Sequence, residues 1–489
     1  MSTPTWADWQ SATSSNVQES VSRTPARTLN TQRSTQRKLV TKTADRSPLS
    51  IVYGNTWCGG KIDYIKQQGS HLVMRALFCV GEVESVDEVR INDASYATGD
   101  YTASPDFKGD YATWAAAQSI ATTDVDIVGG WIFTHSNNTY RVKESVTVLM
   151  GDDLASYSPS AAIYLYEILL TNVEINIYTG TQAQGIDPIL LSYEPTYNET
   201  LLLAGTLDAV CYAVIKIPLA QYGQGLPNIT ARIRGRKVFD PRTNTAVYSN
   251  NPALCLADLI TSTTYGMGFS VDNTSLTTAA NYCDEVIAGE PRSSVNLELD
   301  KADTTASWVD ILRAYAFTFL DWNDTVKFIL DAASAPTHTL KIAPESGADI
   351  LNSVPTRKWL EQTQRPNRIR VIFTDPGNNY NDSSVIVETL EVATGATKER
   401  LSEIRMPGIL SEQQALNLAN RRLLAAQYEK WDIAFDVLDI GIEIESGDVV
   451  NIETVPGTNP VPARVLNRSM TSIGRYSISA RQYKQEVYA

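Results

Sequence analysis

Histidine is scarce in this chain of 489 residues, which has only three: His71, His135 and His338. They lie far apart and show no H-x-x-x-H spacing, so neighbouring helical turns supply no pair of metal ligands. The G-x-S-x-G nucleophile elbow is absent, as are the glycine-rich loops that hold nucleotide phosphates. The sequence therefore predicts no catalytic residue, no metal and no cofactor.

Cysteine is sparse, and long apolar runs are missing. The five cysteines are scattered and form no C-x-x-C pair: Cys58, Cys79, Cys211, Cys255 and Cys283. We expect buried thiols in a reducing compartment, because neither a disulfide framework nor a zinc site has this spacing. The best apolar run, 161–170, is interrupted by Glu167 and falls well short of the roughly 20 residues that cross a membrane. Asp8 and Glu19 exclude a secretory signal at the N-terminus, so we expect synthesis in a cytoplasm and no membrane-spanning segment.

Basic residues are outnumbered, with 41 Lys and Arg against 55 Asp and Glu, a formal net charge of −14. Such a surface argues against DNA or an anionic membrane as a ligand of the whole protein, and it would suit a channel that DNA passes without sticking. The length suggests about three domains. Abundant Tyr, Thr, Val and Ile with many Gly and Pro favour β structure with frequent turns.

Acidic pairs are the remaining route to an enzyme, since glycosidases use two carboxylates. Candidates occur at Asp87-Glu88, at Asp284-Glu285 and at Glu443 with Glu445. A solvated face or a turn explains each of them more simply in so acidic a chain. A tail-associated hydrolase nevertheless stays open as an alternative.

The N-terminal segment, 1–46, is rich in Ser, Thr, Gln and Asn and has almost no apolar periodicity. Its basic residues outnumber its acidic ones and give a local charge of +4 (7 − 3): Arg23, Arg27, Arg33, Arg37, Lys38, Lys42 and Arg46 against Asp8, Glu19 and Asp45. One interpretation is a disordered tail. The other is an extended arm that orders against an acidic neighbouring subunit, with Trp6 and Trp9 as aromatic anchors.

Alternating residues indicate a strand in which Ile229 and Ile233 face the core. Arg232, Arg234 and Arg236 lie two residues apart, so they share the opposite face. They form either a solvated edge, whose like charges suppress stray pairing, or an ion-pair face between subunits.

A hairpin leading into a helix follows. Residues 240–244, D-P-R-T-N, supply turn chemistry, and 245–248 return as the second strand. Asn250 or Asn251 caps the next helix, with Pro252 in the first turn.

Two later helices also have start signals. Thr305 is expected to cap a helix with Trp308 and Leu312 on its apolar stripe. Ser411 and Gln414 form a capping box, in which Gln414 reaches back to the helix start.

Three separated segments resemble one family. They are P-L-S-I-V-Y-G at 48–54, R-G-R-K-V-F-D-P-R-T-N-T with the following N-N-P-A-L within 234–254, and R-P-N-R-I-R-V-I-F-T-D-P at 365–376. These patterns resemble the tail-tip or central hub proteins of long-tailed bacteriophages. The resemblance covers about 47–101 and 205–489.

The resemblance implies a homotrimer that closes the tail tube at its tip in the virion. Implied partners are the distal tail protein, the tail tube, the tape-measure protein and tail fibre or spike proteins, while DNA passes through without specific binding. Because the chain stops at Ala489, we expect a separate fibre protein to contact the receptor. A bacterial surface adhesin is a further alternative, which the missing secretory signal disfavours.

The expected fold is α+β and mainly β, with two β-barrel-like domains, an inserted β-rich subdomain and short packed helices. The predicted divisions are an arm at 1–46, a first barrel-like domain at 47–104 and 205–250, the insertion at 105–204, a mixed α/β domain at 251–345, and a second barrel-like domain with one helix at 346–489.

Overall fold

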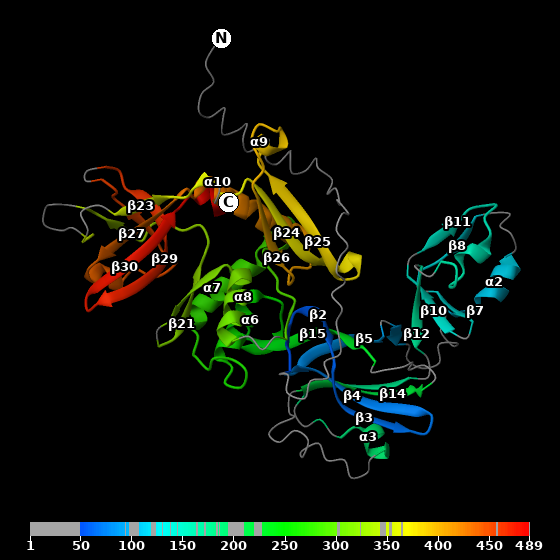
Figure 1. Ribbon diagram of the computed structural model, residues 1–489. Helices are drawn as coiled ribbons and strands as arrows, with labels where there is room; N and C mark the ends of the chain where they lie inside the picture. The colour runs from blue at the N-terminus through cyan, green and yellow to red at the C-terminus, as the bar shows by residue number, and fades with distance from the viewer. Residues whose placement is uncertain are drawn as a thin grey trace.

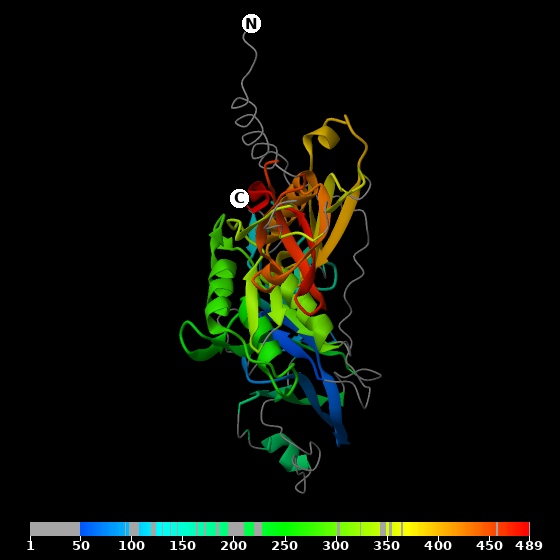
Figure 2. The ribbon, with the colours of Figure 1, turned by 90° about the vertical axis from the view of Figure 1, so that its left-hand side faces the viewer.

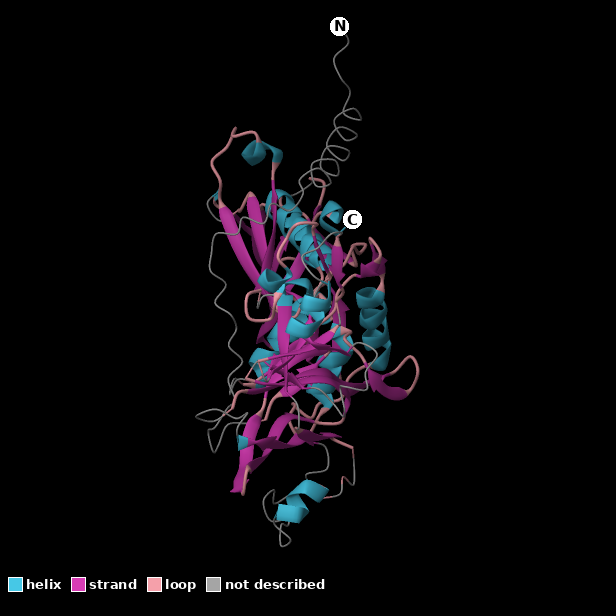
Figure 3. Ribbon diagram, turned by 90° about the vertical axis from the view of Figure 1, so that its right-hand side faces the viewer, coloured by secondary structure: helices cyan, strands magenta, loops and turns pink. Residues whose placement is uncertain are grey.

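A computed structural model gives the structure of the chain. It describes residues 49–92, 94–96, 107–118, 124–129, 131–136, 138–143, 145–162, 165–170, 173–181, 184, 186–193, 210–219, 227–300, 304–322, 324–342, 349–351, 355–362, 365–455 and 458–488. The fold is mainly β and multidomain with few helices, as the sequence predicts. The molecule is elongated, with α9 (Leu390–Ala393) at one end and α3 (Pro188–Tyr193) at the other (Figures 2 and 3).

The first domain is a sandwich of two antiparallel layers. One layer has the order β13 (Glu174–Thr179), β14 (Val210–Pro218), β4 (His71–Val80), β3 (Lys61–Gln68). In the other, β15 (Ile229–Asp240) pairs with β2 (Asn55–Gly59), β5 (Val83–Ile91) and β16 (Thr245–Tyr248). The predicted alternation is confirmed, because Ile229, Ala231 and Ile233 are fully buried between the layers. Helix α3 covers the outer face of the first layer through Leu190.

The inserted segment forms a subdomain with its own aromatic core, which includes Tyr111, Phe133 and Tyr166. Its elements are β7 (Phe107–Asp110), α2 (Tyr111–Gln118), β8 (Val125–Ile127), β9 (Ile132–His135), β10 (Asn138–Val142), β11 (Val146–Val148), η2 (Leu154–Tyr157) and β12 (Tyr166–Leu170). Strand β6 (Ala94–Tyr96) pairs with both β5 and β12, so the sheet of the first domain continues into the subdomain. The subdomain lies at one side of the molecule (Figure 1).

Helices and a small sheet build the middle core. Its elements are β1 (Ile51–Tyr53), α6 (Pro252–Thr261), α7 (Asn273–Asp284), β17 (Val286–Ile287), β18 (Glu290–Pro291), β19 (Leu297–Leu299), α8 (Thr305–Ala316), β20 (Thr318–Trp322), β21 (Val326–Leu330), β24 (Arg368–Asp375), η5 (Pro376–Asn378), β25 (Asn381–Glu388), β26 (Leu401–Met406) and α10 (Glu412–Tyr428). Helix α10 packs Leu418 and Ala419 against the β25-β24-β26 sheet, and both join α6 and α8 in one apolar cluster. The stretch 346–489 thus contributes to two cores, because 365–428 belongs to this one.

The predicted helix caps are confirmed at one helix and displaced by one residue at another. Asn251 caps α6, accepting from the Ala253 and Leu254 amides, with Pro252 in the first turn as expected. The cap of α8, however, is Thr304 rather than Thr305. The one-residue difference arises because the Thr304 hydroxyl reaches the Ser307 amide.

The C-terminal sheet has six strands in the order β22 (His338–Leu340), β28 (Val449–Ile452), β29 (Val461–Ser472), β30 (Arg475–Gln482), β27 (Trp431–Val437), β23 (Thr356–Trp359). Its separate core includes Phe435, Val465 and Ile478. Two short turns, η6 (Asp439–Ile442) and η7 (Gln485–Tyr488), complete this part.

The expectation of barrel closure needs correction. Within the described residues the C-terminal sheet is open, because its edge strands β22 and β23 each pair on one side only. The first domain is likewise two stacked layers with no closed barrel among its described strands. Among the helices that the structure describes, none is both long and apolar enough to span a bilayer.

Candidate functional site

The three predicted interface arginines occupy different settings along β15. Arg234 is about half exposed, and its Nε lies 3.5 Å from the Asp87 carboxylate. Arg232 has a guanidinium nitrogen 4.0 Å from Glu88. Arg236 is largely buried. The row therefore meets acidic residues of its own chain, and its role between subunits stays a prediction. Trp6 and Trp9 lie outside the described residues.

Arg236 belongs to a buried network that links the first domain to the middle core. Its Nε is 3.2 Å from the Asp258 carboxylate of α6. The hydroxyls of Tyr53 and Tyr265 donate to the same carboxylate at 2.6 and 2.8 Å. Burial, reinforced by Asp258, raises the pKa of Tyr53 well above its usual range, so the phenol stays a donor. This contact is structural and joins β1, β15 and α6.

Arg232 lies where the β24–β25 hairpin touches the first domain. Tyr380, beside Arg232, meets Trp57 edge to face with ring centroids 6.2 Å apart. Asn379 and Tyr380 both have left-handed backbones, with φ of 51° and 59°. Two consecutive non-glycine residues in this region carry strain, which the docked ring offsets.

A polar and aromatic junction joins the middle core to the C-terminal sheet. Arg464 of β29 is buried, and it donates to the Leu330 and Gly447 carbonyls at 3.1 and 2.9 Å. Its Nε lies 3.5 Å from Asp331, which follows β21. Arg421 of α10 donates to the same Asp331 carboxylate at 2.8 Å. Asp331 is thus paired with two arginines, one from α10 and one from β29.

Aromatic rings complete this junction. Tyr488 of η7 donates its hydroxyl to Asp331 at 3.1 Å. The Arg421 and Arg464 guanidinium carbons lie 4.9 and 4.8 Å from its ring centre. Nearby, burial raises the pKa of Glu429, at the end of α10, to about 7, although Arg481 opposes the rise. The junction therefore contains a carboxyl that titrates near neutrality.

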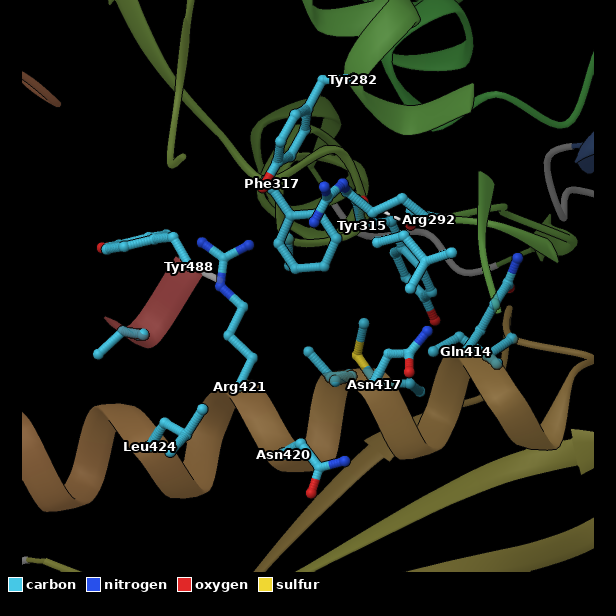
Figure 4. Close-up of a pocket in the computed structure, with 17 residues that line it drawn as sticks. Tyr282, Arg292, Tyr315, Phe317, Gln414, Asn417, Asn420, Arg421, Leu424 and Tyr488 are labelled. Atoms are coloured by element: carbon cyan, nitrogen blue, oxygen red, sulfur yellow. Dashed lines mark hydrogen bonds between the residues drawn. The ribbon is translucent and has the colours of Figure 1, made fainter. Parts of the chain in front are cut away.

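A cavity of about 310 Å³ opens beside this junction, between α10 and the helices α7 and α8 (Figure 4). Its walls combine apolar, aromatic and amide side chains with two arginines, Arg292 and Arg421. No aspartate or glutamate lines it. Arg292 stacks 4.1 Å from the Tyr282 ring centre and pairs with Glu285 at 2.5 Å.

The capping-box expectation fails at this cavity in an informative way. Ser411 does accept from the Gln414 amide at 3.3 Å. The Gln414 side chain, however, does not reach back. It accepts from Ser294 and donates to the Pro291 carbonyl, both at 2.8 Å, and so forms part of the cavity wall. A sequence pattern of local contacts could not anticipate this long-range pairing.

A second cavity, of about 530 Å³, lies in the inserted subdomain between α2 and η2. It is mainly apolar and is lined by Tyr111 and three alanines of α2 (Ala112, Ala115 and Ala116), with His135, Asp153 and Ser158 as its polar residues. Asp153 already caps η2 through the Ala155 amide. Sequence reasoning signalled neither cavity, because each assembles from distant segments.

The candidate acidic pairs are engaged in ion pairs. Every carboxylate of the three sets contacts a basic side chain: Asp87 with Arg234, Glu88 with Arg90, Asp284 with Arg242, Glu285 with Arg292, Glu443 with His338 and Glu445 with Lys327. Across the described stretches, no cluster of three or more His, Cys, Asp or Glu has the arrangement of a metal site. All five cysteines are buried and unpaired by disulfides, as expected.

Residues 306–462 match a family described as "Putative phage tail protein". The match runs from α8 to the start of β29, so it includes all of α10 and Asp331 but ends before Arg464 and Tyr488. Over this part, the chain is similar to phage tail proteins. At the level of a structural phage tail protein the prediction is therefore confirmed, whereas the tail-tip or central hub subtype stays a prediction.

Of three solved structures compared by TM-score, one is similar in fold, and the other two have low scores. A chain of the virion of a native gene transfer agent particle has 14% identity and a TM-score of 0.56, with 100% of this chain and 98% of that chain covered. The tail protein from Neisseria meningitidis MC58 has 11% identity and a TM-score of 0.33, covering 75% of this chain and 92% of that chain. The 43 kDa tail protein of prophage MuSo2 from Shewanella oneidensis has 10% identity and a TM-score of 0.31, covering 90% of this chain and 99% of that chain.

Proposed function

We propose that this phage tail protein is the central hub of a tail tip, where three copies form a ring that caps the tail tube. The ring links the distal tail protein and the tape-measure protein to fibre or spike proteins, and it opens when DNA is ejected. The match of residues 306–462 to a phage tail family carries the proposal. The whole-length fold similarity to a chain of a gene transfer agent virion supports it.

The architecture fits a load-bearing ring component better than a catalyst. Carboxylates that form ion pairs stabilise local geometry, whereas glycoside hydrolysis needs one protonated acid facing a second carboxylate across a bound sugar. The net charge of −14 also suits a channel wall, because it repels DNA rather than binding it. The channel is proposed on this charge and on the family, and assembly is proposed to take place in the bacterial cytoplasm.

Light scattering of the purified full chain tests the ring. We expect a concentration-dependent trimer, and a monomer at every concentration, alone and with a distal tail protein, would contradict the hub. Imaging of particles that carry a label on this chain places it at the tail tip or elsewhere. Release of reducing sugar from host envelopes by the purified chain would instead favour the hydrolase.

A further inference from the structure

The cavity between α10 and the helices α7 and α8 retains two buried donors without partners. These are Nε of Arg292 and Nδ2 of Asn417. Both residues line the same cavity. A buried donor without an acceptor costs about 1–3 kcal/mol, so an acceptor in the cavity regains that free energy when a small side-chain shift turns the donor toward it.

Several other polar groups of the wall already have partners. Gln414 is bonded to Ser294 and Pro291. The Ser293 hydroxyl donates to the Tyr315 carbonyl at 2.7 Å, and the Tyr315 hydroxyl accepts from the Gly408 amide at 2.9 Å. A ligand therefore finds two donors that lack an acceptor, beside polar groups that are already hydrogen-bonded within the protein.

The charge of the cavity lining favours an anionic ligand. Two arginines and no acidic residue line the cavity, in a chain with a net charge of −14. The acidic partners of these arginines, Glu285 and Asp331, stand outside the lining. A carboxylate satisfies donors of this kind better than a neutral acceptor does, because the hydrogen bonds are charge-assisted.

The volume of the cavity and its apolar lining favour a short peptide segment as the ligand. The volume of about 310 Å³ is at the small end of ligand pockets, which span roughly 300–1,000 Å³. Apolar side chains of Met406, Ile409 and Leu418 lie beside the donors. The chemistry fits a short segment in which a carboxylate neighbours an exposed aliphatic side chain.

This chain displays such segments on its own surface. Met150 is 69% exposed near Asp152, Leu390 is 63% exposed beside Glu391, and Ile442 is 59% exposed beside Glu443. We propose that the cavity binds an acidic–aliphatic segment of a second copy of this chain. The proposal rests on the self-association proposed above and assigns one of its contacts. Two copies of this acidic chain repel each other, and a basic cavity that binds an acidic segment offsets part of that repulsion.

Photocrosslinking tests the proposal on the full chain. The variant Asn420→p-benzoylphenylalanine places a reactive group on the α10 wall, and two differently tagged copies are mixed and irradiated. We expect an adduct between the two tags, which mass spectrometry maps to one of the three acidic–aliphatic segments. No intermolecular adduct, or one that maps elsewhere, overturns the proposal.

Matched variants then test the two donors. Arg292→Gln and Asn417→Leu, each added to the crosslinking variant, are expected to lower the adduct yield at least fivefold. Glu285→Gln also breaks the Arg292–Glu285 ion pair but leaves the Arg292 donor in place, so its yield is expected to stay within twofold. Circular dichroism confirms that each variant is folded. Equal yields in all variants would overturn the assignment of the donors.

Light scattering on the same samples separates this inference from the hub. A trimer without the expected adduct rejects the cavity contact and leaves the ring in place. A monomer at all concentrations rejects both.

Discussion

The two junctions on either side of the middle core differ in kind. The first domain joins that core where β15 packs beside β1, which pairs with β19, and where Val238 enters the shared apolar cluster around the buried Arg236–Asp258 pair. The C-terminal sheet joins it through Arg464, Asp331 and their cationic and aromatic neighbours. Exposing polar groups to water costs less free energy than exposing an apolar core, because water can replace the lost hydrogen bonds. The first junction is therefore expected to stay rigid and the second to be where the molecule flexes.

The largest effect is expected from breaking the first junction with Gly235→Val. A Cβ at Gly235 would lie 2.3 Å from the Val52 carbonyl oxygen, so β15 cannot stay beside β1. We expect a loss of more than about 4 kcal/mol and little soluble folded protein, measured by soluble yield and thermal unfolding. Ala246→Val is the control, because Ala246 lies on the exposed strand β16 of the same domain and can accept the same new side chain. Normal stability of Gly235→Val would show that this junction is looser than the contacts imply.

A smaller and more local effect is expected from Arg464→Met at the second junction. The change removes a buried guanidinium from Asp331 and from the Leu330 and Gly447 carbonyls. We expect a loss of about 3 kcal/mol, confined to the C-terminal sheet and η7. Hydrogen exchange should rise there and stay unchanged in the first domain. Arg475→Met, which breaks an exposed pair with Asp436, is the control and should change little.

The pH dependence of the second junction rests on Glu429. Its pKa rises from 4.5 to about 7 on folding, so its contribution to stability is full below pH 4.5 and is lost as the pH rises through 7. Protection factors in β30 and η7, which correct for the base catalysis of amide exchange, should therefore be lower at pH 8 than at pH 5.5. Glu429→Gln should slow exchange at pH 8 by removing an ionisation penalty of about 3 kcal/mol. An identical pH profile in the variant would exclude Glu429 as the cause.

The smallest effect on stability is expected from Arg234→Ala on the first domain. Arg234 is about half exposed and pairs with Asp87 at 3.5 Å, so its removal should cost under about 1 kcal/mol. If the arginine row faces another subunit, the same change should still weaken the trimer measurably in light scattering. Unchanged association would leave the row as a solvated edge.

Local patterns predicted what depends on local physics. The alternation in β15 and the cap at Asn251 follow from neighbouring residues alone, and both are confirmed. The mainly β class and the tail family also followed from composition and three short motifs. Gln414 shows the limit, because its side chain satisfies residues more than a hundred positions away. The open sheets, the shared middle core and the cavity depend on such distant pairings, which one sequence does not reveal.

The tight turn at Asn379 and Tyr380 bears on the order in which the chain is built. Its left-handed backbone carries strain, and the contact of the Tyr380 ring with Trp57 opposes that strain. Trp57 leaves the ribosome long before the turn does, so a completed N-terminal sandwich can act as a template for the later hairpin. A destabilising mutation in that sandwich would then remove the surface on which the hairpin docks during synthesis. Misfolding of the later hairpin would be the visible result of a defect in the earlier domain.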